Sequence, residues 1–267
     1  TQSRTALALF LSGIKIRIGP ATKLAQLFLN RRLRQKRSQS AKPEYEYNLD
    51  LVRYYIASNG DTAVALQEPP FMKFDDASIA MLEAEFRKSH IIDADSKLVF
   101  IHPGSGGSAI NLSLQQYAGL AQRISAQCKV FFVITAGPGE LAYARELSGL
   151  MTSCKHYVHE SGTGIIDFCK FINICDLFIS GSTGPLHIAA ALNVNTVAFY
   201  PARRSATALR WQTINSAGHR LSFSPASYTG VNDMAQIDIA AAADTVMEKF
   251  FSAPISALRQ RVHDEQE

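Results

Sequence analysis

Three short glycine-rich segments hold the residues whose types and spacing best suit binding chemistry. They are residues 102–108 (HPGSGGS), 135–140 (TAGPGE) and 180–184 (SGSTG). Glycine lets the backbone approach a ligand closely, hydroxyl side chains add donors, and the amides at the start of a following helix favour an anion. Together the three segments predict a phosphate or diphosphate site. Taken singly, each could be a turn that only closes a strand-to-helix corner.

The third segment leads into a predicted helix. Pro185 suits the first helical position, where a missing amide costs nothing, and residues 182–184 then present their donors to a ligand. His187 lies one turn further on and is either packed in the core or donates a hydrogen bond to the ligand. Glu140, at the end of the second segment, either caps a helix or accepts from a hydroxyl of a sugar or ribose.

Two common nucleotide-binding motifs are absent. The sequence contains neither Gly-x-Gly-x-x-Gly nor Gly-x-x-x-x-Gly-Lys-Ser/Thr, so nicotinamide chemistry and ATP hydrolysis are not favoured. Asp93-Ala94-Asp95 is similar to the Asp-x-Asp pattern that binds a divalent metal with a sugar nucleotide in some transferases. It precedes the first strand of the predicted sheet, on the wrong edge for a ligand, so we interpret it as a solvated connection and expect no metal site.

The elements that must position these segments follow from residue 98 onward, where apolar runs alternate with helical stretches. Continuous apolar strands separated by helices are typical of a parallel sheet covered on both faces. The predicted strands are 98–101, 130–134, 177–179 and 196–199, and the predicted helices are 114–127, 139–150, 164–174, one from Pro185 and a last one from Asp233. This pattern predicts a doubly wound α/β domain whose glycine-rich segments share one sheet edge.

Residues 1 to about 90 show less regular alternation. We expect helices around short strands at 14–18 and 62–66. Asn48 is expected to cap one helix, and Asp76 to cap another that continues through Lys88.

Composition limits the class of protein. The chain has 267 residues, 47% hydrophobic and 19% charged, with a net charge of +4, which suits an ordered globular protein and does not indicate nucleic acid binding. Four scattered cysteines without a Cys-x-x-Cys pair favour a reducing, cytoplasmic setting over a zinc site or disulfide scaffold. Positive charge gathers in a basic segment that is either a solvated surface or a contact for an anionic ligand or membrane. Its arginines are Arg31, Arg32, Arg34 and Arg37.

Four motifs follow one another in a specific order. They are HPGSGGS at 102–108, residues 111–117, GPGE at 137–140, and residues 176–200 with STGPLHIAAA at their centre. In order and spacing they resemble the C-terminal half of glycosyltransferase family 9, the bacterial lipopolysaccharide heptosyltransferases, and residues 14–37 resemble the later part of that family's N-terminal domain. The resemblance implies a two-domain GT-B fold of the α/β class. Its parts would be a partial N-terminal acceptor-side domain at 1–94, a Rossmann-like nucleotide-sugar-binding domain at 95–252 and a charged tail at 253–267.

The same resemblance implies a reaction. A sugar, commonly heptose, would pass from an ADP-sugar to the lipopolysaccharide inner core or a related surface glycan, with inversion and without a metal or cofactor. Carried over by position, the donor-binding residues would be Ser105, Gly106, Glu140, Ser182, Thr183, Gly184 and His187. The basic segment would face the acceptor or the inner face of the cytoplasmic membrane, which makes the expected protein cytoplasmic and peripheral.

Three departures from the family pattern matter. The usual basic residue, followed two places on by Trp and Pro, reads here as Ile110-Asn111-Leu112-Ser113. Ser182 stands where heptosyltransferases often place an aspartate, so the motif does not fix heptose as the sugar. The family's N-terminal strand with its Gly-Asp motif, the source of the expected catalytic base, is not found in this sequence, so the catalytic residue is unassigned.

These departures leave alternatives open. Arg203, Arg204 or Arg210 is a candidate for the missing positive charge, with plain surface arginines as the simpler reading. The chain could also be a non-catalytic nucleotide-sugar-binding or assembly protein derived from such an enzyme. A sugar-nucleotide epimerase of the GT-B class is a third possibility.

Overall fold

The computed structural model describes residues 3–62, 65, 67–107, 110–162, 164–226 and 233–251. Contacts divide the chain into two units, called here the small unit (Thr1–Gln67 with Arg203–Gln212) and the sheet unit (Glu68–Ala202 with Thr213–Glu267). The boundary expected after residue 94 falls inside the sheet unit, because the helix before it packs on the sheet layer. In that contact Phe86 lies 5.1 Å from Phe171, ring centre to ring centre.

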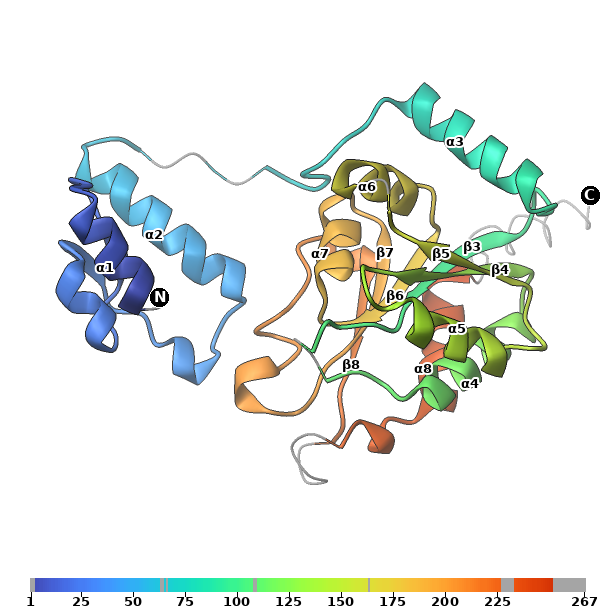
Figure 1. Ribbon diagram of the computed structural model, residues 1–267. Helices are drawn as coiled ribbons and strands as arrows, with labels where there is room; N and C mark the ends of the chain where they lie inside the picture. The colour runs from blue at the N-terminus through green and yellow to red at the C-terminus, as the bar shows by residue number, and fades with distance from the viewer. Residues whose placement is uncertain are drawn as a thin grey trace, which may run out of the picture. The chain divides into compact units, whose positions relative to one another are not determined.

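The sheet unit is built on six parallel strands in the order β5-β4-β3-β6-β7-β8 (Figure 1). In chain order they are β3 (Lys97–His102), β4 (Val130–Ala136), β5 (His156–Glu160), β6 (Leu177–Gly181), β7 (Asn195–Phe199) and β8 (Arg220–Phe223). The predicted α/β fold with a parallel sheet is confirmed. The sequence missed β5 and β8, which lie at the two edges and are only partly buried, so their polar residues hide the continuous apolar pattern.

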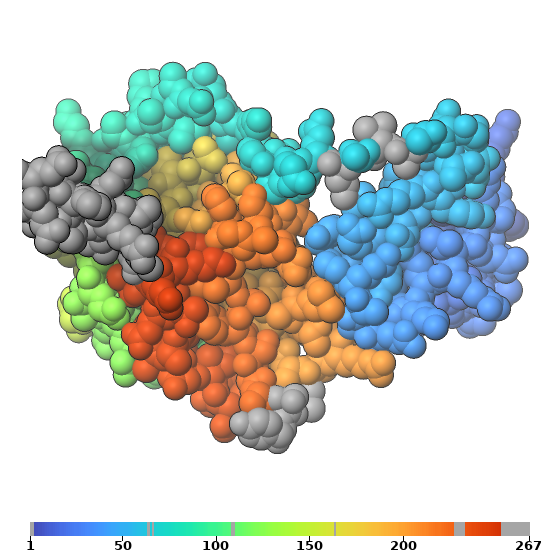
Figure 2. Space-filling view, turned by 180° about the vertical axis from the view of Figure 1, so that it is seen from behind, coloured from blue at the N-terminus to red at the C-terminus, as the bar shows by residue number. Residues whose placement is uncertain are grey.

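Helices cover both faces of this sheet (Figure 1). One face carries α4 (Leu114–Ser125), α5 (Leu141–Leu150) and α8 (Ile239–Val246), and the other carries α3 (Asp76–Ser89), α6 (Ile165–Asn173) and α7 (Gly184–Ala191). Alternate residues of β3 serve the two layers: Val99 and Ile101 belong to the core with α4, whereas the Phe100 ring lies 4.9 Å from Phe171 of α6. Figure 2 shows α8 in red on the outer surface of its layer.

The observed helix starts correct two sequence predictions. α3 is capped by Asp75, whose carboxylate accepts from the Ser78 amide at 2.9 Å, rather than by Asp76. α8 is capped by Asp238, while Asp233 caps the short 3-10 turn η5 (Met234–Gln236). A π-helical turn, Met247–Phe251, continues α8.

The small unit has two parallel strands, β1 (Ile18–Pro20) and β2 (Arg31–Leu33), so the strand expected at 14–18 begins at its last residue. Its helices are α1 (Ser3–Leu11) and α2 (Glu44–Ser58), with the 3-10 turns η1 (Leu24–Phe28), η2 (Arg37–Gln39) and η3 (Arg204–Ala206). Asn48 lies inside α2, not at its cap, because Pro43 fixes the entry and Glu44 and Glu46 supply the acidic first turn.

Two predictions, the strand at 62–66 and the tail at 253–267, lie wholly or partly outside the described residues. Among the described residues, no helix has both the length and the apolar character that a membrane-spanning segment needs.

Candidate functional site

The sheet order sets the place of the site. β3 has β4 on one side and β6 on the other, so the chain leaves β3 toward one edge of the sheet and later returns to pair on its other side. Open parallel sheets bind ligands beyond the carboxyl ends of the strands at such a switch point. The loops after β3, β4 and β6, which are the three glycine-rich segments, all lie at the carboxyl ends of the strands.

Glu140 joins two of these loops. α5 begins at the next residue, and the Glu140 side chain makes no capping bond to it. Instead, Oε1 accepts from the Gly106 amide at 2.8 Å and Oε2 accepts from the Gly137 amide at 3.1 Å. A Cβ at Gly104 would overlap the carboxylate, so a larger residue there would displace Glu140 from this position. An internal carboxylate thus occupies amides that the sequence alone would offer to a phosphate.

Asn111 holds the first loop against the end of β6. Its Nδ2 donates to the carbonyl oxygens of Pro103 at 2.8 Å and Gly104 at 3.1 Å. Its Oδ1 is buried, has no hydrogen-bond partner within the described part of the chain, and lies so close to Gly181 that a Cβ there would overlap it. Sequence reasoning passed over this asparagine, although it stands in the motif that departs from the family pattern.

The loop after β6 enters α7. Gly184 is the first residue of that helix, so Pro185 takes the second position rather than the expected first. Thr183 is buried, and its hydroxyl lies 3.0 Å from Ser180 Oγ, so that hydroxyl is engaged within the fold. Half-buried Ser182, exposed Gly184 and the first-turn amides of α7 remain as the groups that can meet an anion. Burial lowers the pKa of His187, so this ring is neutral near pH 7.

Two adjoining hollows lie beside these loops. The first has a volume of about 360 Å³ and contains Ser105, Gly106 and Glu140 among its lining residues. The second has a volume of about 470 Å³ and reaches to Met234. Both are lined by Asn111, Leu112 and Tyr143. Of the expected donor-binding residues, the structure therefore brings the first three to one hollow and places Ser182, Thr183, Gly184 and His187 at the neighbouring strand end.

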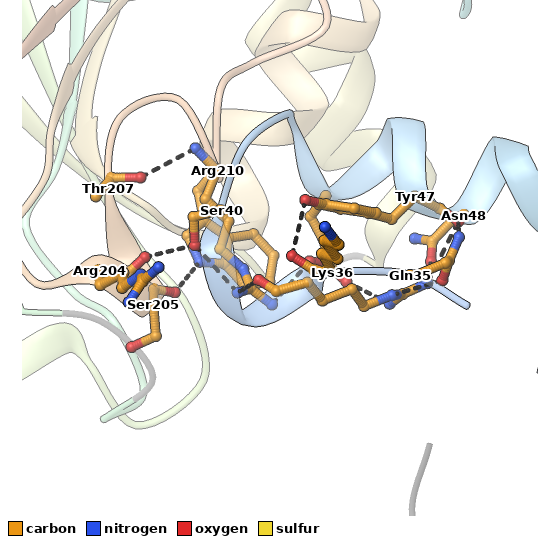
Figure 3. Close-up of polar contacts among 12 residues, drawn as sticks. Gln35, Lys36, Ser40, Tyr47, Asn48, Arg204, Ser205, Thr207 and Arg210 are labelled. Atoms are coloured by element: carbon orange, nitrogen blue, oxygen red, sulfur yellow. Dashed lines mark hydrogen bonds and ion pairs between the residues drawn. The ribbon is translucent and has the colours of Figure 1, made fainter. Parts of the chain in front are cut away.

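Two of the arginines considered from sequence are internal ion-pair partners within the small unit. Glu44 of α2 binds Arg37 Nη1 at 2.6 Å and Arg210 Nη2 at 2.9 Å. Arg210 Nη1 also donates to the Arg37 carbonyl at 2.7 Å and lies beside Ser40 (Figure 3). Arg37 and Arg210 thus each take part in an ion pair within the small unit. The expected contact of Arg37 with an acceptor or membrane, and the use of Arg210 as the missing donor-site charge, stay predictions.

The remaining arginines differ in exposure. Arg32 and Arg34 are exposed, whereas Arg31 is half-buried and its Nη1 finds no hydrogen-bond partner among the residues that the structure describes. Arg203 and Arg204 are exposed, and the Arg204 carbonyl accepts from Ser40 Oγ at 2.6 Å. Arg31, Arg32 and Arg34 therefore remain candidates for contact with an anionic partner.

Comparisons with known proteins agree on one family. The model of glycosyltransferase family 9 (heptosyltransferase) matches residues 1–218. A Haemophilus influenzae protein, provisionally named a glycosyltransferase, is 41% identical over 214 residues, which are 80% of this chain and 62% of that protein. This chain therefore spans less than two thirds of that relative's length.

Solved structures share the fold. The family 9 glycosyltransferase of Veillonella parvula has a TM-score of 0.72 at 14% identity, covering 94% of this chain and 72% of that one. The Escherichia coli ADP-heptose lipopolysaccharide heptosyltransferase II has a TM-score of 0.64 at 16% identity, covering 93% of this chain and 74% of that one.

Proposed function

The chain belongs to glycosyltransferase family 9, and on that premise we propose that it transfers a sugar, heptose or a related one, from an ADP-sugar to the lipopolysaccharide core or a related surface glycan. The observation that carries the proposal is the meeting of three glycine-rich loops at the switch point of the parallel sheet. The fold is shared with a protein described as an ADP-heptose lipopolysaccharide heptosyltransferase, which supports this donor class.

The nucleoside lies in the hollow beside Glu140. A volume of about 360 Å³ falls within the range of small-ligand pockets, and the Tyr143 ring offers an apolar face for a base. The Glu140 carboxylate uses one lone pair of each oxygen on the loop amides, which leaves acceptor capacity for the ribose hydroxyls.

The diphosphate lies at the start of α7. The amides of residues 182–184 and the positive end of the helix dipole stabilise it, and neutral His187 can donate a ring N–H from the next turn. Transfer inverts the anomeric carbon: an acceptor hydroxyl forms the new bond while the bond to the diphosphate breaks, and a carboxylate base takes the proton. Ile110 supplies no charge where the family has a basic residue, and the oriented amides stabilise the departing diphosphate.

The acceptor side is the small unit. Exposed Arg32 and Arg34, with Arg31, give β2 and its continuation a positive surface that suits an anionic saccharide or the anionic inner face of the cytoplasmic membrane. Replacing Arg32 and Arg34 with glutamine removes two exposed positive charges and should weaken binding to anionic vesicles. The comparison is made at low salt, because at 0.1 M salt exposed charges act over only about 10 Å. If the unaltered chain and the variant sediment equally with the vesicles, the membrane contact in this proposal is rejected.

Calorimetric titration of the chain with ADP, ADP-heptose and UDP-glucose tests the donor class. The proposal predicts that the two adenine nucleotides bind and that UDP-glucose does not. Binding of UDP-glucose alone would reject the adenine assignment, and binding of none would reject the donor site as a whole.

A further inference from the structure

The buried side chain of His102 lies where the polar contacts of all three ligand loops meet. His102 is the last residue of β3 and is only 3% exposed. Its ring Nδ1 lies 3.1 Å from the Thr135 carbonyl and 3.0 Å from the Thr135 hydroxyl on β4. Its Nε2 lies 3.5 Å from Glu140 Oε2. One ring therefore contacts both the strand before the second loop and the carboxylate after it.

The backbone of the same residue reaches the third loop. Ser180 Oγ donates to the His102 carbonyl at 2.9 Å and lies 3.0 Å from Thr183 Oγ1, directly before α7. A continuous set of buried polar contacts thus runs from Glu140 through His102 and Ser180 to Thr183. It joins the proposed nucleoside site to the proposed diphosphate site.

The tautomer of the ring follows from its partners. The Thr135 carbonyl can only accept, so Nδ1 carries the hydrogen and donates. Burial lowers the pKa of His102, and the Glu140 carboxylate opposes that shift only in part, so the ring is neutral near pH 7. With the hydrogen on Nδ1, Nε2 carries none and donates nothing to Oε2, so the ring bounds the carboxylate by packing alone and the negative charge of Glu140 stays available to ligand hydroxyls.

The Glu140 carboxylate therefore sits in a slot. The His102 ring bounds one side, the backbone of Gly104 bounds another, and the amides of Gly106 and Gly137 fix the two oxygens. Without the ring, this slot would be open on one side and the carboxylate would gain other rotamers.

We propose that His102 is a positioning residue for donor binding, which holds the Glu140 carboxylate toward the ribose hydroxyls and links it through Ser180 to the loop that begins α7. The inference rests on the proposed function, because it requires a nucleotide in the hollow beside Glu140. The chemistry recognised is a pair of ribose hydroxyls on a nucleoside diphosphate.

The test compares the affinities of ADP and 2′,3′-dideoxy-ADP by calorimetric titration. In the unaltered chain ADP should bind about tenfold or more tightly than the dideoxy compound, the effect of hydrogen bonds to a charged acceptor. His102→Asn keeps an amide donor for Thr135 but removes the far side of the ring, and it should reduce this preference to within about twofold. Glu140→Gln should reduce the preference as well, and the double variant should reduce it no further than Glu140→Gln alone.

A merely structural role for His102 predicts a different result. His102→Asn would then weaken both nucleotides by the same factor and leave their ratio unchanged, which would overturn the inference while the proposed function stands. Failure of the unaltered chain to bind ADP would instead reject the proposed function, and with it this inference. His102→Phe gives a second check: it keeps most of the ring volume, so it should retain more of the preference than His102→Asn.

Discussion

Glu44→Gln tests whether the ion cluster in the small unit holds the segment 203–212 in place. Glu44 bridges Arg37 and Arg210, and the three side chains are only 17%, 23% and 15% exposed. Glutamine keeps the shape and one acceptor but leaves two guanidinium groups without their counter-charge. Breaking a fully buried pair costs about 3–5 kcal/mol, and the partial exposure here reduces the expected loss to about 2–3 kcal/mol.

The assay uses the protein's single tryptophan, Trp211, which lies in the same segment and donates from its ring nitrogen to the Ser205 carbonyl at 3.0 Å. Its fluorescence during urea unfolding therefore reports on the small unit. At a slope of about 1–3 kcal/mol per molar urea, the midpoint should fall by about 0.7–3 M.

Glu46→Gln is the matched control on the same helix. Glu46 binds Arg53 at 3.0 Å, and that pair is 27% and 44% exposed, so its loss should change the stability by no more than about 1 kcal/mol. Equal midpoints for the two variants would refute the reasoning, because the cluster would then hold the segment no better than a surface ion pair does.

Two further variants test the sheet unit. Gly181→Ala places a Cβ on the Asn111 amide oxygen and should destabilise the sheet unit by about 1–3 kcal/mol. Adding Asn111→Ala should recover part of that loss. Thermal unfolding of the single and the double variant measures the recovery, and its absence would contradict the assigned contact. Burial lowers the pKa of His159, whose ring stacks 4.1 Å from Phe171, so its neutral form adds stability above the unfolded pKa of about 6.5 that is lost as pH falls. His159→Phe should therefore make the decline in unfolding free energy between about pH 7 and pH 5 shallower, and an unchanged slope in urea titrations would count against it.

The central strands were readable from sequence for a physical reason. Both faces of β3, β4, β6 and β7 are buried under helices, so their sequences are largely continuous apolar runs, and glycine-rich loops follow β3, β4 and β6. The edge strands β5 and β8 bury less and carry His, Arg and Ser, so the same rule misses them. Helix starts were misplaced at α3 and α8, where another Asp caps the helix, and at α2, which begins directly after Pro43.

The site was readable only in outline. Sequence places Glu140, Ser182 and Gly184 at the ligand edge because they follow parallel strands. It does not show that the Glu140 carboxylate binds the Gly106 amide, since that contact joins loops far apart in the chain. Long-range contacts also decide the role of Arg210, which reads as a surface charge until the fold brings it to Glu44.

The most direct test of the account is the affinity of ADP for Gly184→Glu compared with Gly149→Glu, measured by calorimetric titration. Both glycines are exposed and a Cβ at either meets nothing within 4 Å, so both variants should fold. At the first position of α7 the new carboxylate suits the helix dipole and would occupy or repel the place of the diphosphate, whereas Gly149 lies in the last turn of α5. The account predicts that Gly184→Glu abolishes ADP binding while Gly149→Glu retains it. Equal binding by the two variants would contradict a diphosphate site at α7.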